Sequence, residues 1–173
     1  MNQRFFTSCL RVFLCGLILF IAGCGGAKKP DGMPALHKTT LTFTQGGTPL
    51  AEATVALVPL EGAMTWPAGG VTDNNGVLRV KTQGQFEGAP AGNYKITVSK
   101  TETEGTAETG ESSDEANVRP VAVSSNVKSY YLVDKKYRNA KDSDLTLEVK
   151  AGTNTETFDL GPAVRELIPV FRD

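Results

Sequence analysis

Cysteine is scarce in this chain and is confined to its start. The 173 residues contain three cysteines, Cys9, Cys15 and Cys24. After Cys24 the chain therefore cannot form an internal disulfide, although a secreted compartment would allow one. We expect its folded part to be held together by an apolar core alone, which a single domain of this size can supply.

Histidine is nearly absent, with His37 as the single example. A zinc peptidase needs several His and Glu ligands, and a Ser-His-Asp set needs a histidine beside its nucleophile. His37 lies in a linker-like stretch, where a histidine is typically solvated. The chain has no G-x-x-x-x-G-K-[ST] phosphate loop, and the stretch DNNG at 73–76 lacks the spaced carboxylates of a calcium loop. We expect no catalytic residues, no metal and no cofactor.

The apolar run near the start, Val12 to Ala22, has eleven apolar or small residues. It is too short to cross a bilayer as a helix, which takes roughly 20 residues. Arg4 and Arg11 lie ahead of this run, and residues 1–23 contain no acid. A basic region, a short apolar region and a small-residue exit are typical of a cleaved signal peptide, here residues 1–23.

The exit of this run, Ile21-Ala22-Gly23-Cys24, resembles a bacterial lipobox. The resemblance implies that Cys24 receives a diacylglyceryl group, that a peptidase cuts before it, and that the new amino terminus is acylated. Several acyl chains hold a protein firmly on a membrane, whereas one holds it marginally. The alternative is an ordinary cleaved signal with an incidental cysteine.

Residues 24–37 are rich in Gly, Pro and Lys and are typical of a flexible tether. Residue 25 is Gly rather than the Asp that, in one sorting rule for such lipoproteins, retains them at the inner membrane. We therefore expect a lipid-anchored protein of the bacterial cell envelope, with the outer membrane favoured and its periplasmic or surface face left open.

The charge balance gives no sign of nucleic-acid binding. The chain has 18 basic and 19 acidic residues, and loss of Arg4 and Arg11 with the signal leaves 16 basic residues and a net charge of −3. A nucleic-acid-binding domain usually carries a basic patch. We expect its partners to be the membrane, through lipid on Cys24, and an unidentified envelope protein or glycan.

Several segments between residues 38 and 160 alternate apolar and polar residues, which indicates half-buried strands. The inward positions predicted by this alternation are Leu41, Phe43, Ala53, Val55, Leu57, Leu78, Val80, Tyr94, Ile96, Val98, Leu145, Leu147, Val149, Phe158 and Leu160. Turn signals rich in Gly, Pro and Asn separate these segments. The pattern predicts an all-β domain, an antiparallel β-sandwich of about seven strands.

The stretches GGTPLAEATVALVP, GGVTDNNGVLRV and GAPAGNYKITVSK resemble a carboxypeptidase regulatory-like domain. Residues 130–160 are similar to the second half of small bacterial lipoproteins built on that domain. The resemblance implies a prealbumin-like, or transthyretin-like, Greek-key sandwich with a non-catalytic role. The matching positions are Gly47, Pro49, Leu50, Ala53, Val55, Thr72, Asp73, Gly76, Pro90, Gly92, Tyr94, Lys136, Tyr137, Ser143, Leu145, Thr146, Phe158 and Leu160.

Two segments lie outside the alternating pattern. Residues 101–117 hold six acids, no base and no bulky apolar residue, which predicts a mobile acidic loop. Residues 161–173 form a C-terminal tail, in which Val164, Leu167 and Ile168 fit one helical turn. The tail is apolar enough to dock on the sandwich or on a partner.

Aromatic residues make up only 8% of the chain, and three could serve a ligand. Trp66 lies in a loop-like stretch, and one of the adjacent Tyr130 and Tyr131 must face outward in a strand. Ordinary packing is the competing interpretation. The function we expect is display of a non-catalytic sandwich with a structural, adhesive or protein-interaction role, and the alternative is a surface carbohydrate-binding module.

The lipobox gives the first testable prediction. Cys24→Ala should leave an unprocessed precursor without fatty acid, because the substitution removes the thiol that accepts the lipid. Metabolic labelling with a clickable palmitate measures this, and equal label in the wild type and the variant would contradict the prediction.

Overall fold

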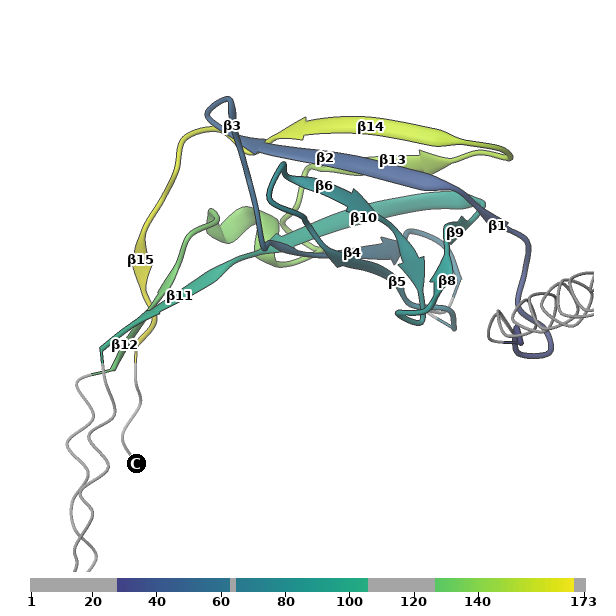
Figure 1. Ribbon diagram of the computed structural model, residues 1–173, viewed down its shortest axis with the longest axis horizontal. Helices are drawn as coiled ribbons and strands as arrows, with labels where there is room; N and C mark the ends of the chain where they lie inside the picture. The colour runs from purple at the N-terminus through teal and green to yellow at the C-terminus, as the bar shows by residue number, and fades with distance from the viewer. Residues whose placement is uncertain (1–27, 63–64, 106–126, 170–173) are drawn as a thin grey trace, which may run out of the picture. The chain divides into compact units, whose positions relative to one another are not determined.

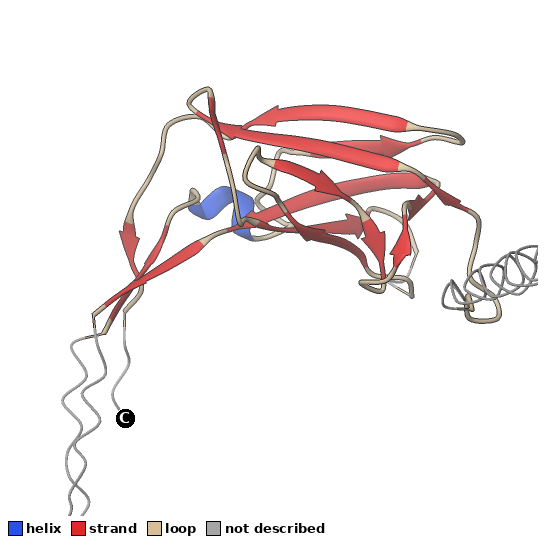
Figure 2. Cartoon of the chain, viewed as in Figure 1, coloured by secondary structure: helices blue, strands red, loops and turns tan. Residues whose placement is uncertain are grey.

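The computed structural model describes residues 28–62, 65–105 and 127–169. The predicted signal peptide, Cys24 and residues 106–117 of the predicted acidic loop lie outside these ranges. Within them no helix is long and apolar enough to span a membrane. The described chain is all-β, and its one helical element is the short 3₁₀ helix η1, Lys135–Arg138 (Figure 2). The all-β prediction is therefore confirmed.

Two larger sheets form the body of the domain (Figure 1). The first has the order β13 (Thr146–Val149), β10 (Gly92–Ser99), β4 (Thr54–Pro59), β5 (Ala68–Val71), β7 (Lys81–Thr82) and β8 (Phe86–Glu87). In the second, β2 (Thr39–Gln45) pairs with β14 (Asn154–Asp159), β3 (Thr48–Pro49) and β6 (Val77–Arg79). We call these two sheets together the body.

Two smaller sheets complete the described chain. β1 (Leu36–His37) pairs with β9 (Ala89–Pro90). The other small sheet has the order β11 (Thr101–Glu104), β12 (Lys128–Tyr131) and β15 (Glu166–Leu167), and we call it the arm. Every described pairing is antiparallel except that of β14 with β2, which run parallel from Asn154 beside Thr39 to Asp159 beside Thr44.

The described ranges contain fifteen short strands rather than about seven. Much of the difference arises because one stretch of chain serves both large sheets. β6 pairs with β2, but after Val80 the chain passes to the other sheet, where β7 pairs with β5 and β8. Val80 bridges the change, since its N–H donates to the Thr39 carbonyl (3.0 Å) and its carbonyl accepts from Gly88 (2.8 Å).

Inward residues of both large sheets belong to one hydrophobic cluster. Its members include Leu41, Phe43, Val55, Leu57, Leu78, Val80, Ile96, Val98, Leu147 and Val149, all nearly fully buried, with Leu145 and Phe158 partly buried against them. The strand phases predicted from the alternation are therefore confirmed. Phe43 and Phe158 stack across the parallel pair with ring centroids 5.5 Å apart.

The turn between β5 and β6 follows from two residues of the resemblance motif. The Asp73 carboxylate accepts from the N–H groups of Asn75 and Val77, each at 2.9 Å. Gly76 has a positive φ of 72°, and a Cβ there would collide with the Phe43 carbonyl. Glycine satisfies both constraints, and its own carbonyl then accepts from Phe43 N–H at 2.8 Å.

The predicted tether, residues 24–37, ends earlier than expected. Leu36 and His37 already form β1, and His37 is half-buried. Its Nδ1 accepts from the Gly152 N–H at 3.2 Å. The interpretation of His37 as a solvated linker residue is therefore wrong. Its strand partner, Ala89, is distant in sequence, so the residues next to His37 do not indicate that it pairs.

The strand phases give a matched pair of stability predictions. Leu57→Ala, Ile96→Ala and Leu147→Ala should each cost roughly 2–5 kcal/mol of unfolding free energy, because each leaves a cavity in the shared cluster. Thr146→Ala, at an exposed position of β13, should cost less than about 1 kcal/mol. Chemical denaturation of the chain from Ala27 onward measures both effects. If the threonine substitution lowers the unfolding free energy and the aliphatic substitutions leave it unchanged, the predicted strand phases are inverted.

Candidate functional site: the three-stranded arm

The arm begins where strand β10 leaves the core. Along β10 the side chains of Tyr94, Ile96 and Val98 are buried, but all four residues of β11 are exposed. The ladder continues across Lys100, whose carbonyl accepts from the Leu132 N–H at 2.9 Å. Gln45 of β2 donates through Nε2 to the Leu132 carbonyl at 2.9 Å. The arm is therefore tied to both large sheets at its base (Figure 1).

Strand β12 is the centre of the arm. In β11, Thr101 lies opposite Tyr131 and Glu102 opposite Tyr130; in β15, Leu167 lies opposite Tyr130 and Glu166 opposite Tyr131. Because successive residues of a strand point to opposite faces, the two tyrosines lie on different faces of the arm. Each face has its own arginine.

On the first face Arg165 covers Tyr130. The guanidinium carbon lies 3.6 Å from the ring centroid, which is cation–π geometry. The same guanidinium pairs with Glu102 at 3.5 Å and with Glu104 at shorter range. The hydrogen bond from Arg165 lowers the pKa of Glu104 below its usual range, and the same pair raises the pKa of Arg165.

On the second face Arg138 covers Tyr131, with 3.8 Å from the guanidinium carbon to the ring centroid. Arg138 also binds the Glu166 carboxylate at 2.5 Å, and Thr103 and Ser129 share a hydroxyl hydrogen bond of 3.2 Å. The Nε of Arg138 is buried and has no hydrogen-bond partner among the described residues. The guanidinium is thus held by the ring and one carboxylate.

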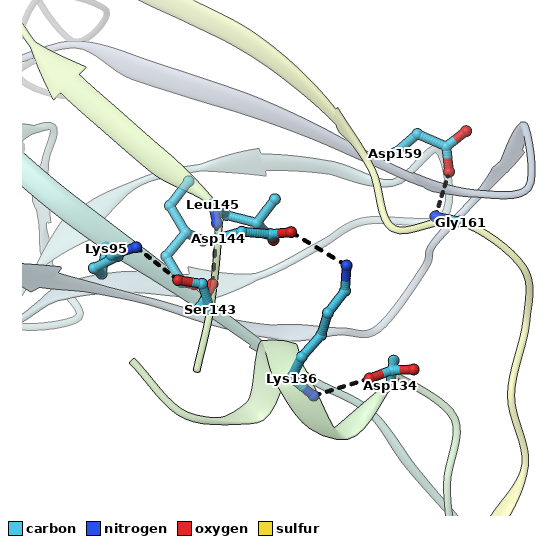
Figure 3. A network of polar contacts seen from close by, with 9 residues as sticks. Lys95, Asp134, Lys136, Ser143, Asp144, Leu145, Asp159 and Gly161 are labelled. Atoms are coloured by element: carbon cyan, nitrogen blue, oxygen red, sulfur yellow. Dashed lines mark hydrogen bonds and ion pairs between the residues drawn. The ribbon is translucent and has the colours of Figure 1, made fainter. Parts of the chain in front are cut away.

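Helix η1 positions Arg138 on this face. The Asp134 carboxylate caps the helix by accepting from Lys136 N–H at 2.9 Å, and Lys136 Nζ pairs with Asp144 at 3.2 Å (Figure 3). Tyr137 is buried and joins the core cluster. Since Tyr137 points inward, the next residue, Arg138, is available to the arm.

Ser143 fastens the chain that follows η1 to β10. Its hydroxyl donates to the Ile96 carbonyl at 2.6 Å, and Lys95 Nζ donates to the Ser143 carbonyl at 2.7 Å. Figure 3 shows Lys95, Ser143 and Leu145 clustered around this connection. The resemblance motif placed a serine here, and its role in this structure is to support the fold.

The arm lacks the buried apolar face that usually stabilises a small sheet. In its place it has two arginine–tyrosine stacks with ion pairs, and it exposes Leu167 at 55%. Tyrosine and arginine are enriched at protein interfaces, where rigid aromatic rings and planar guanidinium groups bind at low entropic cost. The arrangement is suited to non-covalent recognition.

The three aromatic residues predicted as ligand-binding do not form one platform. Tyr130 and Tyr131 each have a ring face covered by an arginine, which leaves at most the opposite face of each ring for a ligand. Their role in ligand binding stays a prediction. Trp66 is half-buried near Tyr94 at the start of β10, whereas the tyrosines lie beyond its end. Tyr94 and Thr101 are seven residues apart along this extended stretch of chain, which corresponds to about 23 Å.

The predictions for two flanking segments also need correction. The predicted acidic loop 101–117 begins with strand β11, and the predicted tail 161–173 contains strand β15 in place of the predicted helical turn. The sequence analysis did not identify the charged residues of the arm, which are Arg138, Arg165, Glu102, Glu104 and Glu166. The alternation of Thr and Glu in TETE at 101–104 is compatible with a strand. Because the stretch contains no apolar residue, the hydrophobic pattern does not indicate one.

The described ranges hold no group of three or more His, Cys, Asp or Glu side chains that could hold a metal ion. No family model, curated protein or solved structure matches the chain. The carboxypeptidase regulatory-like resemblance therefore stays a prediction from the motif residues.

The arm gives a prediction about local order. Arg165→Gln removes the cation over Tyr130 and the partner of Glu104, so amide exchange should quicken at Ile168 and across β11, while the Ile96 amide in the body stays protected. Lys150→Gln, which breaks an exposed ion pair with Glu148 but involves no ring, is the matched control. Hydrogen exchange read by NMR distinguishes them, and equal effects of the two variants would contradict the assigned role.

Acid should loosen the same contact. Because Arg165 lowers the pKa of Glu104, the pairing is complete above the usual carboxylate range, near pH 4.3 for glutamate, and is lost as the pH falls through the lowered pKa. Arm amides of the wild type should lose protection in that window. In Arg165→Gln they should be insensitive to it.

Proposed function

We propose that this chain is a bacterial envelope lipoprotein that uses lipid on Cys24 to display a non-catalytic β-domain for protein interaction, with structural and adhesive roles as variants of the same task. The lipobox at 21–24 and the Gly/Pro/Lys-rich stretch after it support the anchor. Gly25 supports an outer-membrane destination.

We also propose that the body is a prealbumin-like Greek-key sandwich of the carboxypeptidase regulatory-like kind. Support comes from motif residues that have defined structural tasks: Asp73 and Gly76 in a tight turn, and Ser143 bonded to β10. Tyr94 is buried, and its hydroxyl donates to the Pro90 carbonyl at 2.8 Å. These are fold-forming residues, so they support an architecture rather than a reaction.

A non-catalytic role fits the use made of the single histidine. The Nδ1 of His37 accepts a backbone hydrogen bond from Gly152, and its carbonyl accepts from Thr39 Oγ1 at 2.9 Å. The residue thus joins β1 to the start of β2 and to the turn that contains Gly152. A general base needs a free lone pair directed at a substrate, and that lone pair is occupied here.

The composition of the arm is the main support for a role in protein interaction. It stands on the continuous β10–β11 chain, it exposes Leu167 beside Tyr130, and arginines on both faces hold the tyrosines in place. Preorganised aromatic and arginine side chains next to an exposed apolar residue are the usual composition of an interface centre. We assign the partner-binding surface to Tyr130, Arg165 and Leu167.

Site-specific crosslinking on intact cells tests this assignment. A photoreactive amino acid at position 167 should give a discrete, protease-sensitive adduct, because a protein partner would lie against the arm. Position 71 is the matched control, since Val71 is exposed to 58% on β5 of the body and Leu167 to 55%.

Tyr130→Ala should abolish the adduct formed from position 167 if the arm surface binds the partner. Equal adducts from positions 71 and 167 would contradict the proposal. So would an adduct that resists protease but is removed by glycan-degrading enzymes, which would point to the carbohydrate-binding alternative.

A further inference from the structure

A concave site of about 320 Å³ lies at the end of the body where β4 ends and β10 begins. Its wall includes Trp66, Tyr94, Pro59 and Pro90, together with Glu61 and Asn93. The volume is at the lower end of the range for small-molecule sites, enough for one or two small rings. The arm lies at the other end of β10, so this site is separate from the surface assigned above.

Hydrogen bonds within the protein hold the part of the wall that is formed by the start of β10. Leu60 N–H donates to the Asn93 carbonyl at 2.9 Å, and Tyr94 donates to the Pro90 carbonyl at 2.8 Å. Burial raises the pKa of Tyr94 and keeps its hydroxyl a donor. Tyr94 also lies opposite Pro59 in the β10–β4 register. This part of the wall needs little reorganisation when a ligand binds.

The chemistry of the lining selects the kind of ligand. Trp66 is half-buried and Pro59 and Pro90 are partly exposed, which gives flat apolar surfaces. Glu61 and Asn93 are exposed beside them and supply a carboxylate acceptor and an amide that both donates and accepts. The carboxylate disfavours anions, and the two polar groups disfavour a purely apolar ligand.

We propose that this site binds one neutral pyranose unit of a glycan. The C–H face of a pyranose ring stacks on an indole, and its hydroxyl groups donate to a carboxylate and exchange hydrogen bonds with an amide. Glu61 accepts from ring hydroxyls, Asn93 bonds a neighbouring hydroxyl, and Trp66 carries the apolar face. The binding task is independent of the partner assigned to the arm.

Intrinsic fluorescence reports on this site directly, because Trp66 is the single tryptophan of the chain. The detergent-purified full-length protein is titrated with chitotriose, cellotriose and maltotriose. At least one should give a saturable change in Trp66 emission. Glu61→Gln should weaken that response at least tenfold, because the amide offers one acceptor oxygen without the charge.

Glu156→Gln is the matched control, since Glu156 is an exposed acid on β14 outside the site. It should bind as the wild type does, and circular dichroism checks that both variants fold. The proposal is overturned if none of the three saccharides gives a saturable response or if Glu61→Gln leaves the response unchanged. Saturation by a proline-rich peptide in place of the sugars also overturns it.

Discussion

Burial of one face of β10 is the constraint on which the rest of the structure depends. Tyr94, Ile96 and Val98 point into the core, while the strand pairs with β4 on one side and β13 on the other. With no cysteine after Cys24, apolar contact and backbone pairing must hold this arrangement without a disulfide. A typical domain has only about 5–15 kcal/mol of net stability, so each of these buried residues carries a sizeable share.

The two candidate surfaces are consequences of how β10 begins and ends. At its start, Tyr94 turns its hydroxyl to Pro90 and forms the wall beside Trp66. At its end, Val98 is the last residue with a buried side chain, and the same chain continues as the exposed strand β11 of the arm. One rigid strand therefore sets the separation between a pocket and a protruding sheet that have no side chain in common.

The arm shows how a small sheet can persist without a core. Its tyrosines are covered by Arg138 and Arg165, and the arginines are in turn bound by glutamates. Such contacts are individually weak at a surface and are screened by salt. The arm is therefore the part of the described chain that we expect to respond first to acid or salt.

Local pattern in the sequence was sufficient for the strand phases of the body and for the turn at Asp73 and Gly76. Period-two burial and the need for a positive φ are properties of neighbouring residues, so they can be read from the chain itself. The roles of His37, Arg138 and Arg165 could not be read in this way. His37 meets Gly152, Arg138 meets Glu166 and Arg165 meets Glu104 only after distant segments fold together. Whether TETE is a loop or a strand was likewise decided by β12 beside it, because an exposed strand without apolar residues is ordered by its pairing partner and not by its own burial.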